Sequence, residues 1–282
     1  MLAVIGGSGL YQLAGLQINQ ERTLLTPFGT PSAAISLGEY YGQPMLFLAR
    51  HGSEHHLLPH EINYRANIYA LKALGARRIM SFSAAGSLRQ QVKPGDLALV
   101  EQYFDHTRGG RTQSFFGQGI AAHVSTANPV CAALNSDIQR AAASAAEPIH
   151  INNCYACVEG PRLGTRAESF FLRDAANCDL VGMTNLPEAF LAREAQIAYS
   201  SVCLITDYDC WLDDPSQHVS ADKFLEVYSD TLARATGLLK PLLHSPFTAT
   251  PSHISQALKS ALLTPRDQLS SAQQQWLEVL ER

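Results

Sequence analysis

The chain has 282 residues, of which 46% are apolar and 16% charged, and its formal net charge is −4. This length suits one large α/β domain or two small ones and is enough to bury a sizeable core. No block of Lys and Arg occurs, so nucleic acid and anionic membrane surfaces are not expected as partners, and no run of about 18 apolar residues predicts a transmembrane helix.

Strand-like and helix-like segments alternate from the first residues onward. Strands are predicted over residues 2–5, 34–38, 44–49, 78–83, 97–101, 148–158, 179–182 and 198–206. Several are continuous apolar runs, which suits a central sheet covered on both faces. Helices are predicted over residues 61–75, 129–144, 166–176, 186–195 and 220–243, the last with Ser220 as its N-cap. The alternation predicts an α/β layered fold.

The first predicted strand runs into Gly6-Gly7-Ser8-Gly9. Glycines let backbone N–H groups approach an anion closely, and the Ser8 hydroxyl adds a donor. The spacing is not that of a dinucleotide-binding loop, because Gln12 stands where a small residue is needed, and no Gly-Lys-Ser/Thr marks a Walker loop. An anion-binding loop and a simple turn therefore both stand as interpretations.

Candidate anion donors recur where other strands end. Arg50-His51-Gly52 follows the strand over 44–49, the segment from Ser83 to Ser87 ends the strand that begins at 78, and Thr184 follows the strand over 179–182. Ligands of open α/β sheets bind beyond the carboxyl ends of the strands, and a guanidinium with hydroxyls and amides suits phosphate. Taken singly, Arg50 is better explained by a surface ion pair and Thr184 by a helix cap; together they favour a phosphate site.

The strand over 198–206 leads into two carboxylates, Asp207 and Asp209, in "LITDYDCW". Carboxylates beside a buried strand cost desolvation energy unless they are paired or bind a ligand. In an extended chain, residues 207 and 209 face the same way, so we expect both carboxylates on one side. The adjacent Cys210 and Trp211 are interpreted as packing residues.

The six cysteines include the pair Cys154 and Cys157, spaced as in redox or zinc sites. That pair lies in an extended segment, where residues i and i+3 face opposite sides, and a second Cys/His pair is missing. We therefore expect buried, reduced thiols and no metal site. The N-terminus lacks the features of a signal peptide, so a cytoplasmic protein is expected.

A linker with two prolines, His244 to Ser252, ends the main body and divides residues 1–243 from a helical extension over 244–282. Thr264-Pro265 is typical of a helix start, and the closing helix carries Trp276, Leu277 and Leu280 on one apolar stripe. The extension is too small for a core of its own, so we expect it to dock on the main body or on a neighbouring subunit.

Seven motifs occur in order: "IGGSGL", "ARHG", "NYRAN", "AAGSLRQQVKPGD", "EGPRLGTRAES", "GMTNLPEAFLAREA" and "TDYDCW". Over residues 1–243 the chain resembles the S-methyl-5′-thioadenosine phosphorylases of the purine nucleoside phosphorylase superfamily. The resemblance implies a single α/β domain with a twisted mixed sheet and flanking helices, and a homotrimer with active sites near subunit boundaries. It implies phosphorolysis of methylthioadenosine to adenine and 5-methylthioribose 1-phosphate, with phosphate as co-substrate and no metal or organic cofactor.

The resemblance also implies roles for individual residues. The phosphate site is expected at Ser8, Arg50, His51, Ser83, Ala84 (through its main chain) and Thr184. Met183 is expected to line the ribose and the two carboxylates to face the purine. The 5′ end is expected to be walled by Ala221, Phe224 and Leu225 and reached by His123 of a neighbour, although periodicity alone favours ordinary helix core for this stripe.

The chain departs from the family pattern in several places. Ser8 stands where a threonine is frequent, and Leu163 where a phenylalanine often stacks on the base. The loop after Trp211 is one residue longer than expected, and residues 244–282 exceed the usual family length.

The chemistry expected of the carboxylates follows from the leaving group. Asp207 is the candidate acid toward purine N7, since burial and Asp209 both raise the pKa of such a carboxyl. Asp209 is the candidate acceptor for a 6-amino group, which favours adenine over hypoxanthine. The alternatives are a 6-oxopurine nucleoside or methylthioinosine phosphorylase, and a non-catalytic nucleoside-binding protein.

Overall fold

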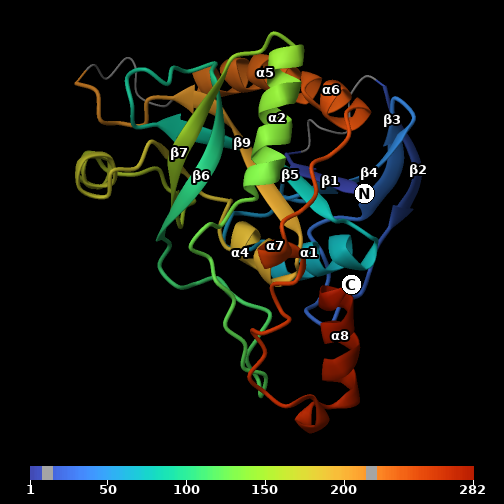
Figure 1. Ribbon diagram of the computed structural model, residues 1–282. Coiled ribbons are helices and arrows are strands. Elements are labelled where there is room, and N and C mark those ends of the chain that lie inside the picture. Colours follow the sequence, from blue (N-terminus) through green and yellow to red (C-terminus); the bar gives the residue numbers. More distant parts are fainter. Residues whose placement is uncertain (8–14, 214–220) are drawn as a thin grey trace.

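The structure is a computed structural model that describes residues 1–7, 15–213 and 221–282, with the backbone alone over 221–226. Over these residues it is a mixed α/β fold with a central sheet flanked by helices, as the sequence predicts (Figure 1). No helix in the described ranges is both long and apolar enough to cross a membrane.

The described strands form one sheet with the order β2-β3-β4-β1-β5-β8-β7-β6-β9, and β9 also pairs with β5. Parallel pairs (β1 with β4 and β5, β5 with β9, β7 with β6 and β8) are mixed with antiparallel ones. The strands are β1 (Leu2–Gly6), β2 (Leu16–Arg22), β3 (Ile35–Tyr40), β4 (Gln43–Ala49), β5 (Arg78–Ser87), β6 (Leu97–His106), β7 (Ile149–Val158), β8 (Leu180–Gly182) and β9 (Ala198–Asp207).

Two strand expectations are corrected. Strand β2 was not predicted, because an edge strand with exposed polar residues shows no apolar run. Strand β5 continues to Ser87 rather than ending near Ser83, because its last residues pair with both β8 and β9. Ser83 and Ala84 therefore lie within a strand and not beyond its end.

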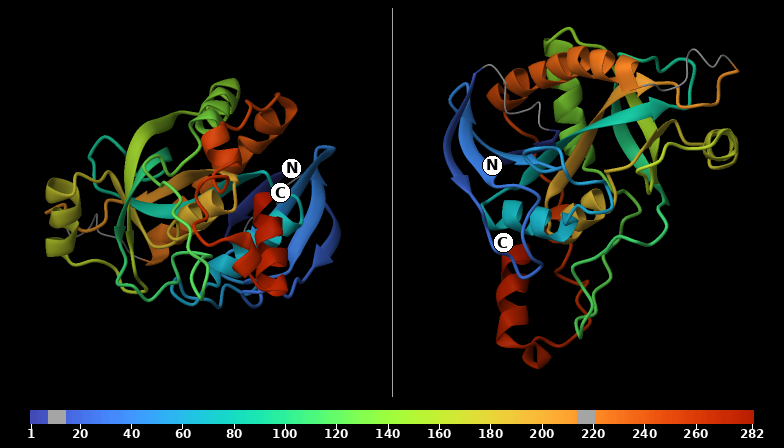
Figure 2. Two further views of the ribbon diagram at one scale, coloured as in Figure 1. Left: turned by 60° about the horizontal axis from the view of Figure 1, so that its bottom comes forward. Right: turned by 180° about the vertical axis from the view of Figure 1, so that it is seen from behind.

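The sheet is covered on both faces, and β1 shows how. Ala3 and Ile5 belong to one buried cluster while Leu2 and Val4 belong to another, as the alternation of a strand requires. The first cluster lies against α1 (Tyr64–Ala73), α4 (Glu188–Glu194) and α8 (Ser271–Glu281), and the second against α2 (Ala132–Ser144), α5 (Ala221–Gly237) and α6 (Leu239–His244) (Figures 1 and 2).

The helices differ from prediction mainly at their ends. The expected helix over 220–243 is interrupted between α5 and α6, and Ser220 lies outside the described residues. The helix over 166–176 consists of α3 (Arg166–Phe170) and a π-helical turn (Phe171–Ala175). Thr264-Pro265 opens only a 3-10 turn (Arg266–Gln268), whereas α8 begins after Ser270, whose side chain forms a capping box with Gln273.

The C-terminal extension, which also contains α7 (Ser252–Ser255), packs on its own main body. The Trp276 ring lies 5.4 Å from the ring of Phe28 and 6.1 Å from that of Phe116, centroid to centroid. Leu277 and Leu280 are buried in the cluster that contains α1 and α4. The main body also binds the end of α8, because the Gln196 amide donates to the carbonyls of Leu280 and Glu281. From the sequence, the extension was expected to dock either on the main body or on a neighbouring subunit. The structure shows that it docks on the main body of its own chain.

Candidate active site

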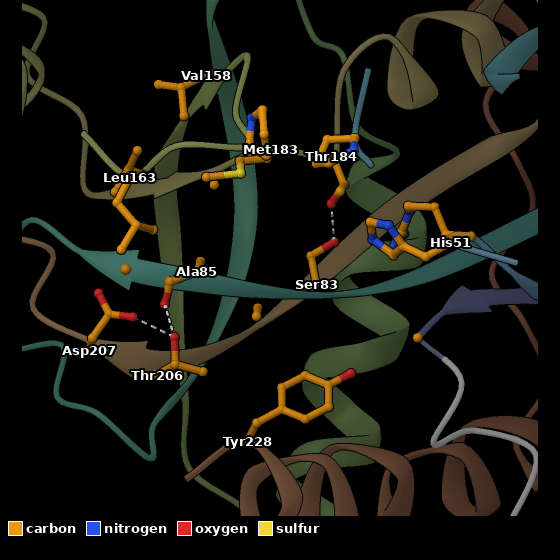
Figure 3. Close-up of a pocket in the computed structure, with 18 of the residues that line it drawn as sticks. His51, Ser83, Ala85, Val158, Leu163, Met183, Thr184, Thr206, Asp207 and Tyr228 are labelled. Atoms are coloured by element: carbon orange, nitrogen blue, oxygen red, sulfur yellow. Dashed lines mark hydrogen bonds between the residues drawn. The ribbon is translucent and has the colours of Figure 1, made fainter. Parts of the chain in front are cut away.

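A cavity of about 620 Å³ opens at the carboxyl ends of β1, β4, β7, β8 and β9 and along the last half of β5 (Figure 3). It gathers most of the residues expected at the site: Arg50, His51, Ser83, Ala84, Leu163, Met183, Thr184, Asp207 and Asp209. These residues lie as much as 159 positions apart, from Arg50 to Asp209. Strand β8 runs antiparallel to β5, which brings Thr184 back to Ser83, whereas β9 runs parallel to β5 and places Asp207 beside Gly86.

Some expected residues are not placed in the cavity. Ser8 lies outside the described residues, although its neighbour Gly7 lines the cavity. The side chains of Ala221, Phe224 and Leu225 also lie outside the described part of the chain. His123 is exposed and is not among the lining residues. Its main-chain N–H donates to the carbonyl of Ala261 in the extension at 3.0 Å.

The Arg50 guanidinium is buried and largely occupied by the protein. Its Nε and Nη2 donate to the two carboxylate oxygens of Glu188 at 2.8 and 3.0 Å, Nη2 also donates to Ser81 Oγ, and Nη1 donates to the Phe82 carbonyl. Burial opposes the charge, but Glu188 outweighs it and raises the pKa of Arg50 above its usual range. The fork expected for phosphate is thus taken by Glu188, and Arg50 brings positive charge and one remaining Nη1–H to the cavity.

His51 is held as a neutral imidazole. Its Nδ1 lies 2.8 Å from the Leu57 carbonyl, and because a carbonyl only accepts, Nδ1 carries the proton. Burial, together with the charge of Arg50, lowers the pKa of His51 to about 4. The ring stacks on His55 at 4.6 Å, and its Nε2 is left as an acceptor.

Ser83 and Thr184 bring two hydroxyls together over β5, with their oxygens 3.2 Å apart (Figure 3). The Ser83 proton goes to Asn185 Oδ1 at 2.7 Å, so Thr184 is the donor between the two hydroxyls. Asn185 is anchored in turn, because its Nδ2 donates to Ser201 Oγ at 2.8 Å and to Tyr103 OH at 3.2 Å. The Thr184 hydroxyl can therefore turn its proton toward a bound anion.

Asp207 accepts hydrogen bonds at both carboxylate oxygens. Oδ2 accepts from Thr206 Oγ1 and Oδ1 accepts from the N–H of Asp209, each at 2.7 Å. Burial is the largest effect on the pKa of Asp207 and raises it, while these hydrogen bonds act in the opposite direction. The carboxyl thus holds its proton to a higher pH than an exposed aspartate.

Asp207 and Asp209 both face the cavity because the chain turns after Asp207, and not because it continues as a strand. Strand β9 ends at Asp207, and Asp209 adopts a φ of 52°, so the chain between them turns and is not extended. The expectation from strand alternation is wrong in its geometry, although both residues line the cavity. Gly86 on β5 provides the space for the Asp207 carboxylate, because a Cβ at this position would lie 2.8 Å from Asp207 Oδ1.

The opposite walls of the cavity are apolar. Met183 follows β8 and Leu163 lies in the loop after β7, with Leu163 54% exposed in the single chain. Cys210 and Trp211 are absent from the described lining. Trp211 packs against the buried cluster that contains Leu172, which confirms its interpretation as a packing residue, and its Nε1 donates to the Ser87 carbonyl at 2.8 Å.

Several cavity residues are not among the site residues expected from the sequence, for example His55, Thr206 and Tyr228. Tyr228 stands one helical turn after Phe224 and Leu225 on α5, so the helical period alone could have identified it. Glu188 carried no such signal, because its partner Arg50 is 138 residues away in the chain.

Residues 1–244 match the model of the family described as the phosphorylase superfamily. The chain is 40% identical to the S-methyl-5′-thioadenosine phosphorylase of Geobacter sulfurreducens over 280 residues, with 99% of this chain and 97% of the relative covered. It is 43% identical to that of Thermosynechococcus vestitus over 283 residues, with the same shares covered.

Solved structures agree with these relatives. A methylthioadenosine phosphorylase from an antarctic soil metagenomic library superposes with a TM-score of 0.91 at 43% identity, covering 99% of this chain and 98% of the other. Methylthioadenosine phosphorylase from Schistosoma mansoni in complex with adenine gives a TM-score of 0.85 at 31% identity, covering 95% and 99%.

Proposed function

The chain belongs to the phosphorylase superfamily, and we propose that its cavity binds S-methyl-5′-thioadenosine beside phosphate and transfers the 5-methylthioribosyl group to phosphate, releasing adenine. The enzyme is a pentosyltransferase with phosphate as nucleophile. The observation that carries the assignment of the site is the convergence of one hydroxyl-rich end and one carboxylate end in a single cavity.

Phosphate is assigned to the end formed by Arg50, His51, Ser83, Ala84 and Thr184. Thr184 donates from its hydroxyl, and Arg50 supplies positive charge and one N–H. The neutral His51 accepts at Nε2, which suits the P–OH group of hydrogen phosphate. Held in this way beside the ribose, phosphate is oriented for attack on C1′ and stabilises the positive charge that develops on the sugar.

The purine is assigned to the carboxylate end. Departure of adenine is easier when N7 receives a proton, and Asp207 is the group whose pKa is raised toward that task. Asp209 accepts from the 6-amino group, whereas a 6-oxo group would place two acceptors against each other. Met183 lies under the ribose in this arrangement, and Leu163 covers the base.

The location and assembly of the enzyme belong to the same proposal. We propose a homotrimer, in which His123 of a neighbour reaches the 5′ end of the substrate. Sedimentation velocity tests this by the mass of the particle, which is expected at three times the 30.7 kDa chain. The cysteines are free, which supports a reducing, cytoplasmic compartment.

The function is tested by initial rates with methylthioadenosine, methylthioinosine, adenosine and inosine, each with and without phosphate. We expect phosphate-dependent release of adenine from methylthioadenosine to be the fastest reaction. Faster release of hypoxanthine would instead identify a 6-oxopurine enzyme. Binding of methylthioadenosine without product would identify a nucleoside-binding protein.

The role of Asp209 in recognising the 6-amino group of the base is tested with a single variant. Asp209→Asn is expected to lower kcat/KM for methylthioadenosine and raise it for methylthioinosine, because the amide can donate to a 6-oxo group; the combined change in selectivity can reach about 10⁴. Comparison of kcat/KM for the two nucleosides in wild type and variant measures it. An unchanged ratio would remove Asp209 from base recognition.

A further inference from the structure

We infer that Arg111, in the loop after β6, is a positioning residue that holds the ribose- and phosphate-facing segment Met183–Thr184 in place. The inference rests on the proposed function, because it assigns those two residues to ribose and phosphate. Arg111 does not line the cavity itself. It acts on the backbone behind the cavity wall.

The Arg111 guanidinium is buried, with the residue 6% exposed, and is surrounded by main-chain acceptors. Nη1 donates to the carbonyls of Met183 and Leu186, both at 2.6 Å, and Nη2 donates to the carbonyl of Glu159 at 2.7 Å. Nε donates to the Glu159 carboxylate at 3.1 Å. One planar group thus joins the segment after β7 to the segment after β8.

These two segments need such a group because the hydrogen bonds between β7 and β8 end before them. Strands β7 and β8 are paired in parallel as far as Cys157 and Gly182, and beyond that pair the two chains are no longer paired with each other. Buried carbonyls without partners cost free energy, and a guanidinium offers several donors in one plane. A lysine ammonium is a compact point charge that cannot reproduce this fork.

The set of hydrogen bonds from Arg111 to these carbonyls, called the clamp below, fixes the position of residues that line the cavity. Met183, whose carbonyl is bound, precedes Thr184, whose hydroxyl meets Ser83 at 3.2 Å. From the β7 side, Gly160 lies so close that a Cβ there would be 2.5 Å from Met183 Sδ. Met183 is therefore held between Gly160 and the bond to Arg111, and a shift of its backbone displaces the Thr184 hydroxyl.

The chain offers a matched control for a purely structural role. Arg193 on α4 is also buried and also donates to main-chain carbonyls, those of Asn128 and Val130, but these segments do not line the cavity. Arg193→Lys removes the same kind of contact as Arg111→Lys. Both variants should lower the Tm, so a difference in substrate binding isolates positioning from stability.

The experiment compares wild type, Arg111→Lys and Arg193→Lys by Tm, by kcat, and by KM for phosphate and for methylthioadenosine. We expect Arg111→Lys to raise KM for phosphate by about tenfold or more, as misplacement of a binding group does, and Arg193→Lys to leave it at the wild-type value. Equal changes in the two variants, or an unchanged KM in a folded Arg111→Lys protein, would overturn the inference.

Two further measurements keep the outcome decisive. Where Arg111→Lys does not fold, Glu159→Gln replaces it: this variant keeps the carbonyl contacts but weakens the orientation of Nε, so KM for phosphate should still rise, and an unchanged KM overturns the inference. Where the wild type proves inactive, the proposed function fails, and calorimetric titration with inorganic phosphate takes the place of kinetics. Weaker phosphate binding in Arg111→Lys than in Arg193→Lys then supports the clamp, and equal binding, or none to the wild type, overturns it.

Discussion

At the scale of single residues, the acid–base properties of the site follow from burial and specific partners. The Asp207 carboxyl is buried, which raises its pKa, while bonds from Thr206 and the Asp209 N–H partly offset that effect. His51 shows the opposite case, since burial and Arg50 lower its pKa to about 4. One end of the cavity therefore favours a protonated acid and the other a neutral acceptor.

Asp207→Asn is expected to reduce kcat for methylthioadenosine by about 10²–10⁴, because the amide keeps the shape of the side chain but cannot transfer a proton to N7. Steady-state kinetics measures the loss, and the Tm checks that the fold survives. KM for phosphate should change little, since phosphate is assigned to the other end of the cavity. A variant with wild-type kcat would exclude Asp207 as the acid.

At the scale of elements, α4 anchors the loop that carries Arg111. Glu194 on α4 accepts from Ser114 Oγ at 2.6 Å and from the N–H of Phe115 at 2.7 Å. Burial raises the pKa of Glu194 to about 7 in spite of these two hydrogen bonds. This contact makes the attachment of the loop to the helix sensitive to pH.

Glu194→Gln should therefore flatten the pH dependence of stability. Between the ordinary pKa of 4.5 and about 7, the folded state binds more protons at Glu194 than the unfolded state, so the free energy of unfolding falls as pH rises through this window. The wild-type loss is at most about 3 kcal/mol, and the variant should lack it. Urea unfolding at the two ends of the window measures the difference.

The matched control is Glu61→Gln, which changes an exposed carboxylate that accepts the N–H of Leu58. It should leave the wild-type pH dependence in place. A Glu194→Gln protein whose stability still falls like that of the wild type would assign the pH dependence to other groups.

Elements were predicted well where the hydrophobic pattern was strong. The buried strands β1, β4 and β9 lie within a residue or two of their predicted bounds, because both faces are covered and the run is apolar. The polar edge strand β2 and the end of β5 were missed, since pairing with neighbours determines both.

At the scale of the whole molecule, the C-terminal extension completes the core on one face of the sheet (Figure 2). Trp276 packs on Phe28, which in turn lies 5.0 Å from Phe115 in the loop beyond Arg111. Residues of the extension also bind that loop directly, since the Ala121 N–H donates to Thr264 Oγ1 at 2.8 Å. The extension and the loop of Arg111 thus form one packed unit.

Trp276→Ala is expected to lower the free energy of unfolding by about 3 kcal/mol or more, because it removes a large buried ring and leaves a cavity. Denaturant unfolding with a single global transition measures the loss. Leu263→Ala, a change at a side chain in the same extension that is 61% exposed, is the control and should cost little. Equal stability of Trp276→Ala and wild type would show that the extension is not part of the cooperative core.

The sequence by itself determined the family, the layered fold and nine of the residues that line the cavity, because ordered motifs and apolar periods are local features of the chain. Only the tertiary structure decided that Glu188 occupies the fork of Arg50, that Asp209 reaches the cavity through a φ of 52°, and that Arg111 joins the ends of β7 and β8. It also decided that the extension docks on its own chain. The physical reason is that a buried charge or carbonyl takes whichever partner the packing of distant segments brings within hydrogen-bond reach, and no local pattern records that choice.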